Sequence, residues 1–110
     1  MTDEQIEKTK SAIAASDRVP PDKKAELLEL LGKLKPAIEK VAKMHDDDAQ
    51  KIGRFVETSA HVATRKEKRP EHLNRVLREL KQSVEKFEAS HPQLTSFVSE
   101  YSAVLSGLGI

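Results

Sequence analysis

The sequence of 110 residues contains no cysteine and no tryptophan, and only four of its residues are aromatic. Without cysteine, disulfides, thiolate metal sites and thiol nucleophiles are excluded. Long apolar runs are missing too: none approaches the roughly 18 residues of a membrane span, and the first residues lack the apolar stretch of a signal peptide. We therefore expect no transmembrane segment and a cytoplasmic location.

An excess of charge of one sign is also absent, because 19 Lys and Arg stand against 18 Asp and Glu, for a formal net charge of +1. Such a balance gives no general attraction to nucleic acid or to an anionic surface. The sequence does contain enough apolar residues to form a modest hydrophobic core. Leu, Ile, Val and Phe number 27, above the roughly one-fifth level below which strongly charged chains stay disordered.

The apolar pattern has the period of helices throughout, and no strand-length stretch alternates with period two. We expect an all-α fold, an up-and-down helical bundle of four main helices plus a short N-terminal helix, in a single domain of residues 1–110. Capping-box spacings mark three expected helix starts: Thr2 with Gln5, Asp47 with Gln50, and Ser90 with Gln93. Prolines in the first turn mark the starts at Pro20 or Pro21, at Pro70 and at Pro92. Gly107 or Gly109 is expected to end the last helix in a left-handed conformation.

Two apolar stripes with alternating spacings of four and three dominate the middle of the chain. We expect them to bury each other as antiparallel neighbours. Pro36 lies inside the first stripe and deprives the Gly32 carbonyl of its donor, which predicts a local bend or a missing hydrogen bond. The stripes are Leu27, Leu31, Leu34, Ile38 and Val41, and Leu73, Leu77, Leu80, Val84 and Phe87.

The two stripes also coincide when the chain is shifted by 46 residues. Residues 27–45 then lie over 73–91 with seven of 19 positions identical, His45 falls on His91, and Phe55 falls on Tyr101. A duplicated helical hairpin would give this pattern, and so would any two amphipathic helices in the same leucine register. Both interpretations remain open at this point.

The segment VEKFEASHPQL (84–94) and the closing GLGI resemble the C-terminal signature of a bacterial family of small helical proteins, family 4404 of the domains of unknown function. The resemblance implies a helical fold and a bacterial cytosolic setting, and it implies no activity. Residues 1–41 are compatible with the first half of the family, whereas the segment at about residues 44–70 is extra. The matching residues are Phe87, Glu88, Ser90, His91, Pro92, Leu94, Gly109 and Ile110.

Histidines next to acids are the first candidates for chemistry. His45 precedes Asp46, Asp47 and Asp48, but adjacent helical residues point about 100° apart and cannot share one ion without partners. His91 reads as a corner residue that contacts Phe87, with a pH-sensitive latch as the alternative. The sequence has no Gly-rich phosphate loop and no nucleophile elbow. We predict no catalytic residue, no metal and no cofactor.

A basic cluster supplies the alternative function, a nucleic-acid- or phosphate-binding module that uses Arg65, Lys66, Lys68 and Arg69. Arg54, Arg75 and Arg78 could extend it. Glu67 interrupts the cluster and no aromatic residue is interleaved for base stacking. Nucleic-acid binding is therefore the less favoured interpretation.

The last helix is nearly uncharged, and the two stripes, if they bury each other, leave it without cover. We therefore predict a non-enzymatic interaction or structural protein that self-associates, as a homodimer or with a partner helix, through this apolar face. The predicted interface consists of Phe97, Val98, Tyr101, Val104 and Leu105.

Overall fold

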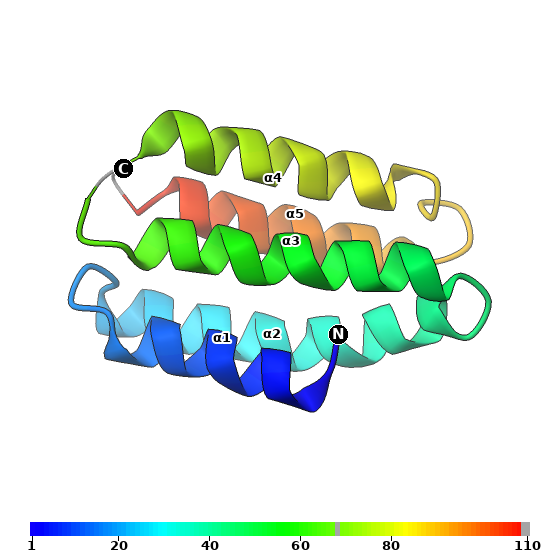
Figure 1. The fold of residues 1–110 in the computed structure, drawn as a ribbon, viewed down its shortest axis with the longest axis horizontal. Coiled ribbons are helices and arrows are strands. Elements are labelled where there is room, and N and C mark those ends of the chain that lie inside the picture. Colours follow the sequence, from blue (N-terminus) through cyan, green and yellow to red (C-terminus); the bar gives the residue numbers. More distant parts are fainter. Residues whose placement is uncertain (68, 109–110) are drawn as a thin grey trace.

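A computed structural model describes residues 1–67 and 69–108, and these residues form five α-helices and no strand. The helices lie side by side along the long axis of the molecule (Figure 1). The predicted all-α fold class is confirmed. The helices are α1 (Asp3–Ala15), α2 (Pro21–Ala42), α3 (Asp46–Thr64), α4 (Pro70–Glu85) and α5 (Pro92–Ser106).

Proline starts three of these helices, as predicted. Pro21, Pro70 and Pro92 are the first helical residues of α2, α4 and α5, where the missing N–H has no partner to lose and the fixed φ suits the helix. The capping box of α1 is also confirmed. The backbone N–H of Gln5 donates to Thr2 Oγ1 at 3.1 Å, and the N–H of Thr2 donates to Gln5 Oε1 at 2.9 Å.

Two other predictions about helix starts are wrong, and so is the left-handed helix end at Gly107. The residue before α5 is His91, and Ser90 Oγ instead lies 3.0 Å from His91 Nδ1. Asp47 lies inside the first turn of α3. Gly107 ends α5 with φ −79°, which is not left-handed, and Gly109 lies outside the described residues. The Ser90 prediction fails because Pro92 is the first helical residue of α5, which makes the residue before it, His91, the N-cap. Ser90 is thus one residue too early to cap the helix.

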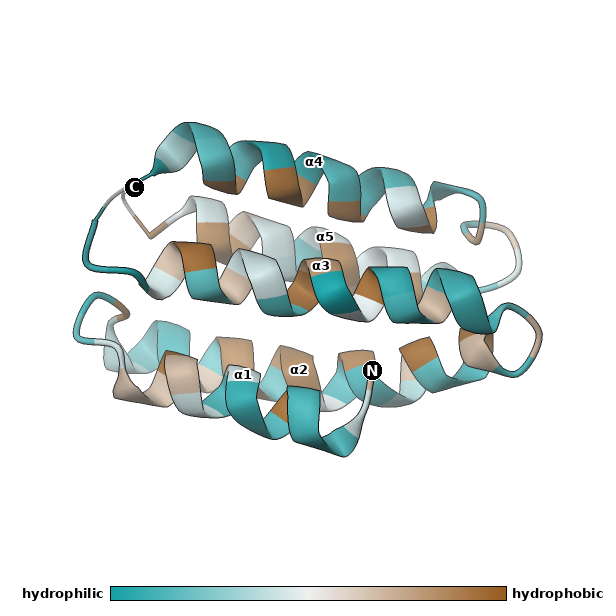
Figure 2. Ribbon diagram, viewed as in Figure 1, coloured by the Kyte–Doolittle hydropathy of each residue, from teal (hydrophilic) through white to brown (hydrophobic). Residues whose placement is uncertain are grey.

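One apolar core receives side chains from all five helices. The stripes of α2 and α4 are both buried in it, but these two helices do not contact each other: α2 packs against α3 and α5, and so does α4. The prediction that the stripes bury each other is therefore wrong. In Figure 2, α4 is hydrophilic on its outer side and hydrophobic toward α3 and α5.

Helix α2 continues through Pro36 as one element. Proline carries no N–H, so the Gly32 carbonyl has no helical donor. Gly32 is exposed, which lets water satisfy that carbonyl.

Helix α1 packs against α2 and α3 and buries Ile6, Thr9 and Ile13. Its acidic first turn lies beside α2, where the Asp3 carboxylate pairs with the Lys35 ammonium; the hydrogen bond and the charge of Lys35 lower the pKa of Asp3. At its other end, Lys24 Nζ donates to the Ala14 carbonyl at 2.8 Å. Asp3 and Ala14 thus fix α1 antiparallel to α2.

Candidate anion-binding groove

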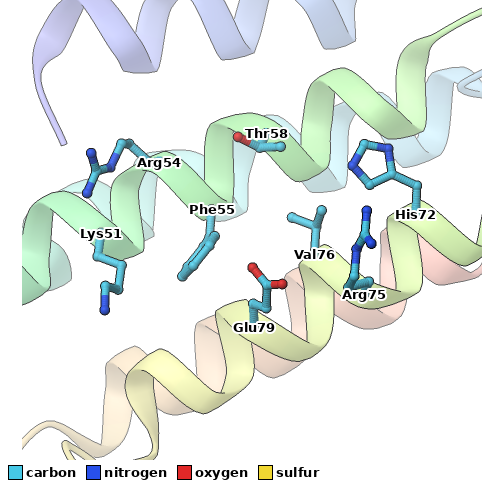
Figure 3. A pocket seen from close by; sticks show the side chains of 8 residues that line it. All are labelled: Lys51, Arg54, Phe55, Thr58, His72, Arg75, Val76 and Glu79. Atoms are coloured by element: carbon cyan, nitrogen blue, oxygen red, sulfur yellow. The ribbon is translucent and has the colours of Figure 1, made fainter.

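Helices α3 and α4 enclose an open groove of about 500 Å³ on their outer side. Figure 3 shows its lining. Each of the two helices contributes four lining residues, which lie at a first position and three, four and seven positions after it. Residues at these spacings share one face of a helix. The lining consists of Lys51, Arg54, Phe55, Thr58, His72, Arg75, Val76 and Glu79.

An aromatic ring lies between the basic groups of this groove. Phe55 is half-buried and projects from α3 toward α4 beside Lys51, while His72 and Arg75 project from α4 toward α3 (Figure 3). Arg54 lies along the rim of the groove on the side of α1. The groove therefore offers an apolar, planar surface with cationic groups on both walls.

The cations among the groove-lining residues outnumber the carboxylates. Within residues 1–67 and 69–108, Lys51, Arg54 and Arg75 form no ion pair, and Glu79 is the only carboxylate among the lining residues. The local charge is thus positive although the chain is nearly neutral. Guanidinium and ammonium groups in this setting bind phosphate oxygens with charge-assisted hydrogen bonds.

A second recess continues the groove beyond Lys51. There the ammonium of Lys86 lies 2.8 Å from the carboxylate of Asp48, and that hydrogen bond lowers the pKa of Asp48. Lys86 is therefore committed to an ion pair. The positive part of the groove is the part between Lys51 and Arg75.

The predicted basic cluster lies outside the groove. Arg65, Lys66 and Arg69 are exposed in the connection between α3 and α4, and Arg69 Nη2 pairs with Glu67 Oε2 at 3.0 Å. Lys68 lies outside the described residues. Of the residues that could extend the cluster, Arg54 and Arg75 line the groove, whereas Arg78 lines a different groove between α4 and α5.

Lys51, Phe55 and His72 were not identified as site residues from the sequence. The sequence does contain an indication of which residues share a helix face. Lys51 and Phe55 are four residues apart, as are His72 and Val76, and residues at this spacing lie on the same face of a helix. The groove thus has the interleaved aromatic residue, Phe55 of α3, that the linear cluster lacks.

The predicted interface on α5 is largely buried within the chain. Val98, Tyr101 and Leu105 have no exposed surface and Val104 is 8% exposed, while Phe97 is half-buried with the Lys33 ammonium 5.8 Å from its ring centre. The interface prediction is wrong for the four buried residues, because α2 and α4 both cover α5. The supposed excess of apolar surface on this helix does not exist.

Tyr101 shows how closely α5 is enclosed. Its hydroxyl donates to the backbone carbonyl of Val56 in α3 at 2.9 Å. Burial raises the pKa of Tyr101 far above its ordinary value, and a hydrogen bond with Ser59 only partly opposes this. The polar end of the ring is thus satisfied inside the core.

The two corner histidines pack on one aromatic ring. His45, before α3, and His91, before α5, have ring centres 5.4 Å and 5.8 Å from that of Phe87. The predicted contact of His91 with Phe87 is confirmed. Among the described residues, no group of three or more His, Asp or Glu side chains is placed to hold a metal ion. No helix in the described part of the chain has the length and apolar character needed to cross a membrane.

Comparison with known proteins finds one family. The model of a domain of unknown function, DUF4404, matches residues 27–110. The match includes the segment at 44–70 and leaves α1 outside. No curated protein and no solved structure matches the chain.

Proposed function

Because the chain belongs to the DUF4404 family, for which no activity is described, we propose a function from its own surface: it is a non-enzymatic binding protein whose α3–α4 groove takes a phosphate-bearing ligand. The observation that carries the proposal is the pair of cations Lys51 and Arg75 on either side of the half-buried ring of Phe55, with Arg54 at the rim; within the described residues none of the three forms an ion pair. Its scaffold is an up-and-down bundle of α2 to α5, with α1 added on one side.

Single-stranded nucleic acid is the ligand that this chemistry fits best. Every base has a π-face, so an aromatic ring binds bases with little sequence preference, and flanking Lys and Arg side chains bind the phosphates. The proposal places the protein in the bacterial cytoplasm, where such ligands are abundant. We do not propose self-association through α5, because most of the apolar face of α5 is buried within the chain.

The proposal is tested with a fluorescent single-stranded oligothymidylate, titrated with the protein at several salt concentrations. Phosphate contacts release counterions, so three of them predict a slope of log K against log salt of about −2. The double variant Lys51→Glu/Arg75→Glu should abolish measurable binding. The matched control Lys40→Glu/Lys43→Glu makes the same change in net charge elsewhere and should retain the slope.

Phe55→Ala separates stacking from charge. Because stacking of one base on an aromatic ring contributes about 1–3 kcal/mol, this variant should bind about 5- to 150-fold more weakly with an unchanged salt slope. Equal weakening by the two double variants would mean that net charge, and not the groove, binds the oligonucleotide.

A further inference from the structure

The structure relates the two hairpins α2–α3 and α4–α5 by the same 46-residue shift that the sequence suggests. The equivalent stripe positions of α2 and α4 are buried. The corner residues have nearly the same backbone angles, φ −140° and ψ 67° at His45 and φ −135° and ψ 64° at His91. The contacts are exchanged as well: α2 packs on α3 and α5, and α4 packs on α5 and α3. Arg69, before α4, has similar angles of φ −135° and ψ 72°, so the relation of the two hairpins rests on the 46-residue sequence match and on the burial of equivalent stripe positions.

The first hairpin carries α1 in a seat with identifiable parts. On α3, Gly53 allows the start of the chain, just before α1, a close approach: a Cβ added at Gly53 would lie 3.2 Å from Met1 Cα. On α2, Lys35 binds the acidic first turn of α1 through Asp3. The residues of α3 that share the face of Gly53 by helical spacing are Ala49, Val56 and Ala60, all buried.

The second hairpin repeats these parts without a helix on top. A shift of 46 residues converts Lys35 into Lys81 and the small face of α3 into Thr95, Ser99, Ser102 and Ser106 on α5. Lys81, Ser102 and Ser106 line an open groove of about 300 Å³ together with Arg78. No helix in the described part of the chain covers it, since α1 contacts neither α4 nor α5.

A buried polar group in this groove lacks a partner. Ser102 is 3% exposed, and its Oγ has no hydrogen-bond partner within the described residues. Thr95 Oγ1, on the same face of α5 but outside the groove lining, is also buried without a partner among the described residues. Buried hydroxyl groups in proteins are normally hydrogen-bonded, so the Ser102 hydroxyl gains a partner if its side chain rotates toward the groove and meets a polar group of a docked helix.

We infer that the α4–α5 groove is a second helix seat, which takes an amphipathic helix with an acidic first turn from a partner protein. The acidic turn pairs with Lys81 and Arg78, as Asp3 pairs with Lys35 in the occupied seat. The partner helix runs antiparallel to α4, as α1 runs antiparallel to α2. Serines in place of alanine and glycine make this seat more polar than the first, so it selects a helix with hydrogen-bonding groups beside its apolar residues.

A second copy of the chain is not the occupant that the structure favours. The only helix of this chemistry in the described residues is α1, and it already fills its own seat, where Ile13 is fully buried. A covalently linked helix also benefits from a high effective concentration that a second copy must overcome. An independent helix meets neither obstacle.

The test uses the full chain and a synthetic peptide of residues 1–17, which is the helix that the first seat is known to hold. In an amide NMR titration, the peptide should shift resonances of 74–81 and 99–106 and saturate, whereas a scrambled peptide should not. Ser99→Trp, at the exposed position equivalent to Gly53, should abolish the shifts. Lys81→Glu should weaken binding at least fivefold, and a peptide with Asp3→Lys should restore it; Lys43→Glu is the matched control.

The outcomes that overturn the inference are distinct. Absence of saturable shifts at millimolar peptide, or equal binding by the Ser99→Trp variant, shows that the groove is not a helix seat. Shifts confined to α2 and α3 show that the peptide only exchanges with α1. If light scattering without peptide gives twice the monomer mass and Ser99→Trp halves it, the occupant is a second copy and the partner helix is wrong.

Discussion

The hydroxyl of Tyr101 is enclosed in the core, and its removal gives a prediction in two parts. Tyr101 has no exposed surface, and its hydroxyl donates to the Val56 carbonyl at 2.9 Å. That carbonyl also accepts from Ser59 Oγ at 2.9 Å. Tyr101→Phe therefore deletes one hydrogen bond without leaving the acceptor unpaired.

At neutral pH the cost of Tyr101→Phe should be small. A net intramolecular hydrogen bond contributes about 0.5–1.5 kcal/mol, and the ring itself stays in place. We expect the free energy of unfolding to fall by about 1 kcal/mol in urea denaturation, with an unchanged dependence on urea concentration.

At high pH the difference should reverse. Burial raises the pKa of Tyr101 in the folded protein above its unfolded value of about 10. Above pH 10 the unfolded chain loses this proton and the folded chain keeps it, so the stability of the wild type declines by up to about 1.4 kcal/mol per pH unit. The Phe variant lacks this loss, and the two proteins differ in no other titratable group.

Two measurements test the reasoning. Denaturation of both proteins at several pH values between neutral and strongly alkaline should show the stability difference shrinking and changing sign. Tyr101 is the only tyrosine and the chain has no tryptophan, so tyrosinate absorbance reports this group alone. A difference that does not vary with pH, or a folded protein whose tyrosine titrates near its ordinary pKa, would refute the enclosure of Tyr101.

Three further predictions concern the helices and the oligomeric state. Gly32→Ala should raise the free energy of unfolding by about 0.5–1 kcal/mol in thermal or urea denaturation. A Cβ at this exposed position meets nothing within 4 Å, so a loss of stability would show that the new methyl group conflicts sterically with Pro36. Thr2→Ala should lower the free energy of unfolding by about 1 kcal/mol, because it removes the capping box of α1. Ser90→Ala should change it by less than about 0.5 kcal/mol, because Ser90 caps no helix. Equal losses of stability would contradict the observed caps. Light scattering should give a mass of 12.3 kDa that does not change on dilution, and a doubled mass would restore the homodimer.

Sequence reasoning succeeded where the cause is local. Pro21, Pro70 and Pro92 begin helices because their chemistry permits little else at those points, and Thr2 with Gln5 forms its capping box within one turn. The apolar stripes are buried as their periodicity predicts. The Ser90 cap failed because a proline two residues later makes His91 the cap residue.

Partnership between helices was harder to predict. Periodicity shows that Leu34 and Leu80 face a core but not which helix each meets, and the assumption that α2 and α4 pair left α5 without cover. The actual exchange of partners covers Val98 and Leu105 within the chain. The groove was missed for the same reason: Lys51 and Arg75 are distant in sequence, and only the packing of α3 on α4 brings them to one surface.

Location of the bound ligand is the most direct test of the central claim, that the α3–α4 groove binds phosphate-bearing ligands. Amide NMR shifts recorded while single-stranded oligothymidylate is added should change most in 51–58 and 72–79, which carry the groove, and little in α1. The changes should disappear with Lys51→Glu/Arg75→Glu. Changes confined to 65–69, or none at low salt, would contradict the account.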